Sequence, residues 1–166
     1  PNLTPGQGGA VGANGVQATF PAGAVGENTV ATLAVTPKPL FDVPNGKAGV
    51  FGVQVGATTV SGKQLAQTAQ PYTIRAQYTD AQLAAAGVQD PASLQLMALD
   101  GGTWQPLPGA VDTQNKLVTG TTNLLQPLAL VGAKQGGGDN GGGDNSGGDN
   151  GGQNGASKLY LPAITR

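Results

Sequence analysis

The chain has 166 residues, of which 9 are acidic and 8 basic, so its formal net charge is −1. This balance provides no basic surface for nucleic acid or for an anionic membrane. The sequence holds no histidine and no cysteine, which excludes Ser-His-Asp and Cys-His nucleophiles, His or Cys metal sites and disulfides. We therefore expect a protein that is not an enzyme and that holds no cofactor and no metal.

Glycine divides the chain into a body and a tail. Of the 29 glycines, 11 lie between residues 136 and 155. The sequence predicts three parts: a β-sandwich domain over 1–134, a Gly/Asp/Asn-rich linker over 135–157 and a C-terminal strand over 158–166. The body carries six acidic and six basic residues, so its net charge is zero.

Short segments of alternating apolar and polar residues follow one another through the body, which is typical of half-buried strands. The expected strands are residues 16–20, 29–36, 50–55, 72–78, 94–99, 103–105, 116–121 and 128–131. In the segment 72–78, Tyr72, Ile74, Ala76 and Tyr78 share one face, so Arg75 is expected to face solvent.

One short helix is expected over residues 81–86. Thr79 or Asp80 can cap it, Gln82 can complete a capping box, and Gly87 can end it in a left-handed conformation. Seven to nine short strands with turns every 8 to 12 residues then predict an all-β, Ig-like sandwich, with a barrel as the second choice.

Three segments of the body occur in an order that is similar to one known family. They are FPAGA at 20–24 ahead of a strand that ends in Thr-Pro at 36–37, PYTI at 71–74, and residues 94–104 around Asp-Gly-Gly. This order resembles ZU5-type β-sandwich domains and their relatives in bacterial secreted proteins, some of which also end in a Tyr-Leu-Pro segment. The resemblance covers residues 10–132 and implies a ZU5-like fold, an interaction module and no catalytic residues.

The linker contains the repeat GGGDN-GGGDN-SGGDN over residues 136–150. Such glycine-rich sequence cannot bury enough surface to order itself, so it predicts a flexible tether. Calcium binding by its Asp and Asn oxygens is an alternative. The repeat lacks the large apolar residue that each turn of a calcium-binding β-roll requires.

The C-terminal strand is apolar on both faces. Leu159, Leu161 and Ala163 would lie on one side of an extended strand, and Tyr160, Pro162 and Ile164 on the other. Such a strand requires burial, because an exposed apolar strand is an aggregation hazard. The predicted partner-binding residues are Leu159, Tyr160, Leu161, Pro162 and Ile164.

Three partners could bind this strand: the chain's own sandwich, an identical neighbour, or a sorting and anchoring apparatus that recognises the C-terminus. A linker of 23 residues has a root-mean-square span of about 26 Å and an extended limit near 75 Å, which reaches either of the first two. The segment 161–165 (LPAIT) superficially resembles a sortase signal, but its threonine comes one place too late. Pro162 restricts strand pairing, because its nitrogen cannot donate.

We hypothesise a structural subunit of an extracellular bacterial filament or sheath, polymerising by insertion of the C-terminal strand into a neighbouring subunit. The partners would then be identical subunits in a homopolymer. The chain begins with Pro1, has no signal-peptide apolar region and no run of about 20 apolar residues, so we expect a mature or trimmed extracellular product without a membrane span.

The alternative hypothesis is a secreted cell-surface adhesion or carbohydrate-binding module whose tail serves sorting or anchoring. Its partner would be a surface glycan, stacked on a platform of Trp104, Tyr72 and Tyr78, although aromatic residues in sandwich strands are more often core. Glycoside hydrolysis would need two facing carboxylates. Glu27 is the only glutamate, and the body's aspartates fall mostly at turns or at a helix cap.

Overall fold

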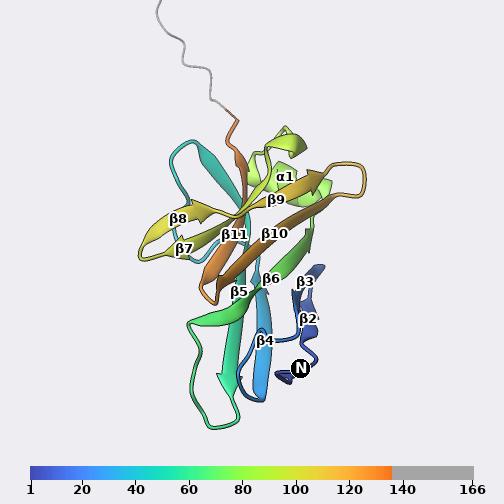
Figure 1. Ribbon diagram of the computed structural model, residues 1–166. Coiled ribbons are helices and arrows are strands. Elements are labelled where there is room, and N and C mark those ends of the chain that lie inside the picture. The colour runs from blue at the N-terminus through green and yellow to red at the C-terminus, as the bar shows by residue number, and fades with distance from the viewer. Residues whose placement is uncertain (136–166) are drawn as a thin grey trace, which may run out of the picture.

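The computed structural model describes residues 1–135, which form two antiparallel β-sheets packed face to face (Figure 1). The predicted linker beyond Gln135 and the predicted C-terminal strand lie outside the described residues. The elements in chain order are β1 (Asn2–Leu3), β2 (Gly9–Ala13), β3 (Val16–Phe20), β4 (Thr29–Thr36), β5 (Lys47–Thr59), β6 (Gln67–Gln77), α1 (Asp80–Ala86), the 3-10 turn η1 (Pro91–Ser93), β7 (Gln95–Asp100), β8 (Thr103–Pro106), β9 (Gly109–Asp112), β10 (Leu117–Leu124) and β11 (Pro127–Ala133).

The strands are divided unequally between the two sheets. The first sheet has the order β1-β4-β5-β11-β7-β8, and the second has the order β2-β3-β6-β10-β9. Every pairing between these strands is antiparallel. The predicted all-β sandwich is therefore confirmed, and the barrel is not the architecture of this body.

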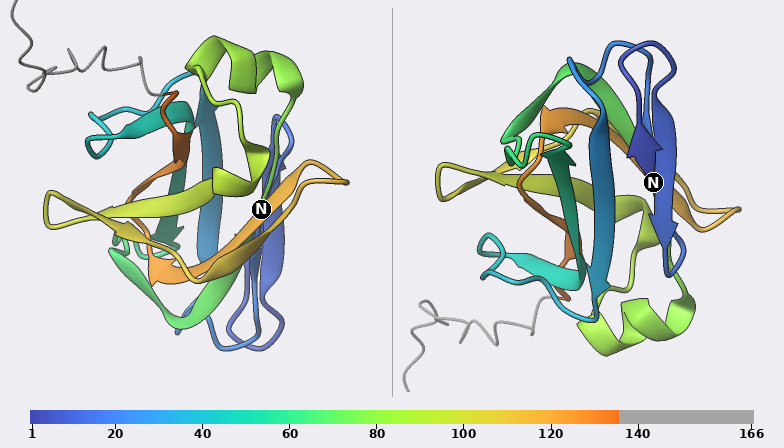
Figure 2. Two further views of the ribbon diagram at one scale, coloured as in Figure 1. Left: turned by 90° about the horizontal axis from the view of Figure 1, so that it is seen from above. Right: turned by 90° about the horizontal axis from the view of Figure 1, so that it is seen from below.

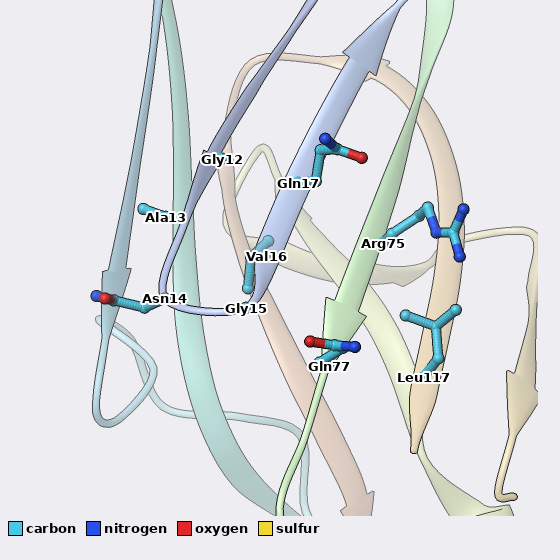
Figure 3. Close-up of a pocket in the computed structure, with 9 residues that line it drawn as sticks. All are labelled: Gly12, Ala13, Asn14, Gly15, Val16, Gln17, Arg75, Gln77 and Leu117. Atoms are coloured by element: carbon cyan, nitrogen blue, oxygen red, sulfur yellow. The ribbon is translucent and has the colours of Figure 1, made fainter. Parts of the chain in front are cut away.

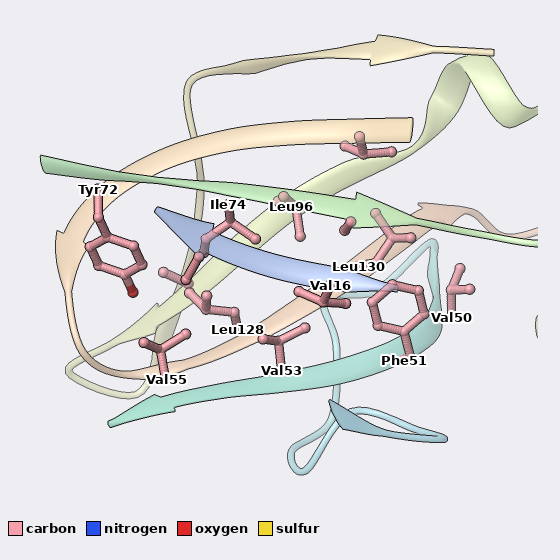
Figure 4. Packing of buried hydrophobic residues seen from close by; sticks show 14 of the residues in the cluster. Val16, Val50, Phe51, Val53, Val55, Tyr72, Ile74, Leu96, Leu128 and Leu130 are labelled. Carbon is pink, nitrogen blue, oxygen red and sulfur yellow. The ribbon is translucent and has the colours of Figure 1, made fainter. Parts of the chain in front are cut away.

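The alternating side chains of the strands fill the space between the sheets (Figure 4). In β6, Tyr72, Ile74 and Ala76 are buried, as is Tyr78 just after the strand, whereas Arg75 is exposed on the outer face, as the alternation predicts. Tyr72 stacks on Phe20 of β3, with 4.7 Å between the ring centroids.

The helix α1 has the predicted capping box. The backbone N–H of Gln82 donates to Thr79 Oγ1 at 3.2 Å, and Gln82 Oε1 accepts from the backbone N–H of Thr79 at 2.9 Å. Gly87 ends the helix with a φ of 73°, a left-handed conformation that favours glycine. Leu83 is the helix residue that is buried against the body.

Three short strands, β1, β2 and β9, are absent from the predicted set. The signal for β2 is the Asn14-Gly15 pair, whose φ values of 47° and 79° form the two-residue turn of the β2–β3 hairpin. The strand β2 itself consists of glycine, alanine and one valine, which have too little β propensity to indicate a strand on their own.

Candidate strand-acceptor edge

The predicted partner-binding residues Leu159, Tyr160, Leu161, Pro162 and Ile164 lie outside the described residues. The surface that could receive them must be an edge of the sandwich, because the interior is already filled. Leu128 and Leu130 of the central strand β11 are 1% and 0% exposed, and all the described strands belong to the two sheets. An added strand would therefore extend a sheet and not replace a core strand.

The flank that carries β8 and β9 is closed by the chain itself. After β8 the chain crosses from the first sheet to the second at Leu107 and Pro108. The N–H of Leu107 donates to Leu96 O at 2.9 Å, and the N–H of Thr121 donates to Pro108 O at 3.0 Å. These two bonds attach the crossing segment to both sheets, so the chain itself covers that flank.

The opposite flank carries β4 and is only half covered. The two-residue strand β1 pairs with Thr29 and Val30, and the N–H of Ala31 donates to Pro1 O at 2.9 Å. No strand of residues 1–135 pairs with the remaining residues, 32–36, on this side. We call residues 32–36 of β4 the open edge.

Two residues of the open edge direct their main-chain groups outward. Antiparallel strands bond to one neighbour through alternate residues, and Ala31 bonds toward β1. Leu33 and Val35 share the alternation of Ala31, so their N–H and C=O groups point away from β5. The open edge therefore presents four main-chain hydrogen-bonding groups.

The same two residues point their side chains inward. Leu33 and Val35 are half-buried and pack against the main core, whereas Ala34 between them is exposed. Val11 of β2, which is also half-buried against the core, lies on the strand that runs beside β4 on this flank (Figure 2). A strand added to the open edge would thus gain hydrogen bonds and cover apolar side chains at once.

The other edge strands offer less for pairing. The strand β2 holds two glycines among five residues, β9 has four residues, and β8 ends in Pro106, which cannot donate. The open edge instead reads Thr-Leu-Ala-Val-Thr, in which β-branched and apolar residues favour an extended strand.

The three aromatic residues of the predicted glycan platform do not lie together on one surface. Tyr72 and Tyr78 are buried between the sheets. Trp104 lies in β8, half-buried in a separate cluster that includes Met97 and Val131. Its indole N–H donates to Asp42 O at 2.6 Å, which ties the loop between β4 and β5 to the first sheet.

The carboxylates serve local structure, as turn chemistry predicts. Asp90 caps η1 by accepting from the N–H of Ala92 at 2.9 Å, and Glu27 accepts from Ser61 Oγ at 3.2 Å. Asn115 donates to Asp112, and this bond lowers the pKa of the Asp112 carboxyl. Among residues 1–135, no group of three or more acidic side chains is placed to hold a metal ion, and no helix has the length and hydropathy to cross a membrane.

A polar hollow of about 520 Å³ lies on the outer face of the second sheet, beside the β2–β3 hairpin (Figure 3). Gln17 and Arg75 are cross-strand partners in its floor, and Gln77 and Asn14 border it. Arg75 forms no ion pair with any of the described residues. No local sequence signal marks this hollow, because its residues come from three separate segments.

No family model matches the chain, and the comparison with curated proteins found no similar sequence. The similarity to ZU5-type domains therefore stays a prediction.

Proposed function

We propose that this chain is a non-catalytic structural subunit that forms an extracellular homopolymer by donating its C-terminal strand, residues 158–166, to a sheet edge of a neighbouring copy. The observation that carries the proposal is the segment 158–166, which is apolar on both faces of an extended strand and follows a glycine-rich segment; among residues 1–135, the edge of β4 beside half-buried Leu33 and Val35 offers main-chain groups for pairing. An edge of this kind is the surface that strand addition uses.

Two further features support assembly with identical copies. The body is uncharged overall, with six acidic and six basic residues, so copies do not repel one another strongly. One donor and one acceptor per subunit make a heterologous contact, which produces a filament unless the rotation closes it into a ring. The 23-residue segment 135–157 is long enough to carry the donor to a neighbour.

Sedimentation velocity and electron microscopy of two deletion variants test this proposal. Removing residues 158–166 is expected to abolish polymer and leave a monomer with an unchanged thermal unfolding transition, because residues 1–135 enclose a hydrophobic core of their own. Removing residues 146–150, one repeat of the linker, is the matched control and is expected to leave polymer intact. Filaments that survive the first deletion would overturn the proposal.

A glycan-binding module is the second candidate, and the polar hollow at Arg75 favours it. Amide side chains such as Gln17 and Gln77 can bond sugar hydroxyls, and Arg75 can bind a carboxylate. The aromatic trio gives this candidate no support, because its members lie in different places. Binding to a panel of neutral and acidic glycans tests it: loss with Arg75→Gln is expected, and no binding by the unaltered chain contradicts it.

A further inference from the structure

We infer that two adjoining hollows on the outer face of the second sheet form one binding site for an acidic oligosaccharide, with a sugar carboxylate at Arg75 and a neutral sugar in the hollow beside it. This inference rests on the glycan-binding candidate above and specifies its ligand class and the order of its two subsites. It does not depend on assembly into a homopolymer.

The charge of this sheet face is that of one arginine. Arg75 is the single basic residue in the five strands of the second sheet, and Asp112 is the single acidic one. Asp112 is already occupied, because its carboxylate accepts hydrogen bonds from Gln114 and Asn115. Arg75 forms no ion pair within residues 1–135. One guanidinium on an otherwise neutral strand face fits a ligand that carries one negative charge at this point.

Amide side chains surround Arg75. Gln17 lies directly opposite it on β3, with about 5 Å between Cβ atoms, and Gln77 follows two residues along β6, about 7 Å away (Figure 3). Among the described residues, no hydrogen bond engages the side chain of Asn14, Gln17, Arg75 or Gln77. Each amide offers a donor and an acceptor, which together suit sugar hydroxyl groups.

A second hollow of about 440 Å³ adjoins the first and shares Asn14, Gly15 and Gln77 with it. Its basic side chain, Lys116, is already paired, with Nζ 2.5 Å from Asp80 Oδ2. The second hollow therefore offers polar groups and a neutralised charge, which suit an uncharged sugar. Both volumes fall within the range usual for ligand pockets, about 300–1,000 Å³.

The arrangement favours a saccharide over other carriers of a negative charge. A ligand that fills both hollows must have at least two units, with the acidic unit at Arg75. A planar carboxylate matches the two parallel N–H groups of a guanidinium better than a tetrahedral sulfate does. An acidic peptide would need apolar pockets or a sheet edge. This site lies on the face of a sheet, and the lining of the hollow at Arg75 is mainly polar.

Calorimetric titration of the full chain with tetrasaccharides tests the acidic subsite. The probes alternate a hexuronic acid with a neutral sugar, and each is compared with its carboxyl-reduced form, with a sulfated neutral tetrasaccharide and with a glutamate hexapeptide. Carboxyl reduction and Arg75→Gln are each expected to weaken binding by about 10- to 100-fold, because charge-assisted hydrogen bonds are lost. Arg75→Lys is expected to restore only part of the affinity, since it keeps the charge and loses the bidentate geometry.

Gln82→Glu tests the second subsite. Gln82 lines the second hollow, and its Oε1 accepts the capping-box bond from Thr79, which leaves Nε2 available to a ligand. Glutamate keeps the capping box and removes this donor. The variant is expected to bind the tetrasaccharides about 3- to 10-fold more weakly and to bind the free hexuronic acid unchanged. Lys63→Gln, which removes an exposed cation from the connection between β5 and β6, is the matched control and is expected to leave both affinities unchanged.

Each contrary result overturns a stated part of the inference. Equal binding of the carboxyl-reduced probes overturns the acidic subsite and leaves a glycan-binding module standing. Equal or tighter binding of the sulfated probe or of the peptide overturns the ligand class. Unchanged tetrasaccharide affinity in Gln82→Glu overturns the second subsite, and an equal loss in Lys63→Gln overturns the assignment to Arg75. No binding of any saccharide overturns both this inference and the glycan-binding candidate, and leaves the proposed homopolymer standing.

Discussion

Tyr72 and Tyr78 form a natural pair for testing how polar groups contribute to this core. Both side chains are buried between the sheets, at 0% and 3% exposure. The hydroxyl of Tyr72 donates to Leu124 O at 2.8 Å, whereas the hydroxyl of Tyr78 is buried without a hydrogen-bond partner among residues 1–135. Replacement of each tyrosine by phenylalanine removes a hydroxyl oxygen, which is hydrogen-bonded in Tyr72 and has no partner in Tyr78.

Tyr72→Phe is expected to lower the free energy of unfolding by about 1–1.5 kcal/mol, because a made hydrogen bond is lost and Leu124 O loses its partner. The stacking on Phe20 is kept. For a body of this size that change corresponds to a drop of roughly 3–6 °C in the midpoint of thermal unfolding. Tyr78→Phe is expected to be neutral or to stabilise by up to about 1 kcal/mol, since it removes an unsatisfied buried hydroxyl.

Burial also raises the pKa of both phenols, and this effect gives a second, independent readout. A raised pKa means that the unfolded state releases its proton first as the pH rises. The contribution of Tyr72 to stability is therefore complete below the ordinary tyrosine pKa, about 10, and is lost progressively above it. Urea unfolding of both variants at neutral pH measures what each hydroxyl contributes to stability. The same measurement at alkaline pH measures the effect of tyrosine ionisation. An equal loss of stability in the two variants at neutral pH would refute the reasoning.

Three further predictions concern local structure. Thr79→Ala is expected to cost about 1 kcal/mol of unfolding free energy through loss of the helix cap, measured by urea unfolding, while Thr79→Ser keeps the cap and most of the stability. Asn115→Ala is expected to raise the depressed pKa of Asp112 toward its ordinary value, so an NMR titration of that carboxyl should move to higher pH; an unmoved titration would contradict the assigned cause. Trp104→Phe is expected to cost about 1 kcal/mol by removing the bond to Asp42 O and to speed hydrogen exchange in residues 37–46; unchanged exchange would show that this bond does not hold the loop.

Many strands and turns of the body can be predicted from the sequence, because the alternation of apolar and polar residues and the residue types of turns are local features. The bounds of β3 and β4 coincide with the predicted 16–20 and 29–36, and the capping box of α1 has the expected partners. These features depend on residues close together in the chain. Local signals therefore suffice for them.

The open edge, in contrast, could not be predicted from local signals. Recognising it requires that β4 be placed at the margin of its sheet, beside β1, and this placement is a matter of strand order. The separation of Trp104 from Tyr72 and Tyr78 likewise depends on which sheet face each strand presents. Strand order is decided by contacts between distant segments, and no single segment of sequence encodes it.

Electron microscopy of the purified full chain tests the central claim most directly. The account predicts filaments whose subunit repeat matches one sandwich body, and it predicts only monomers once residues 158–166 are removed. A full chain that stays monomeric at high concentration, or that forms the same filaments without those residues, would contradict assembly through the C-terminal strand.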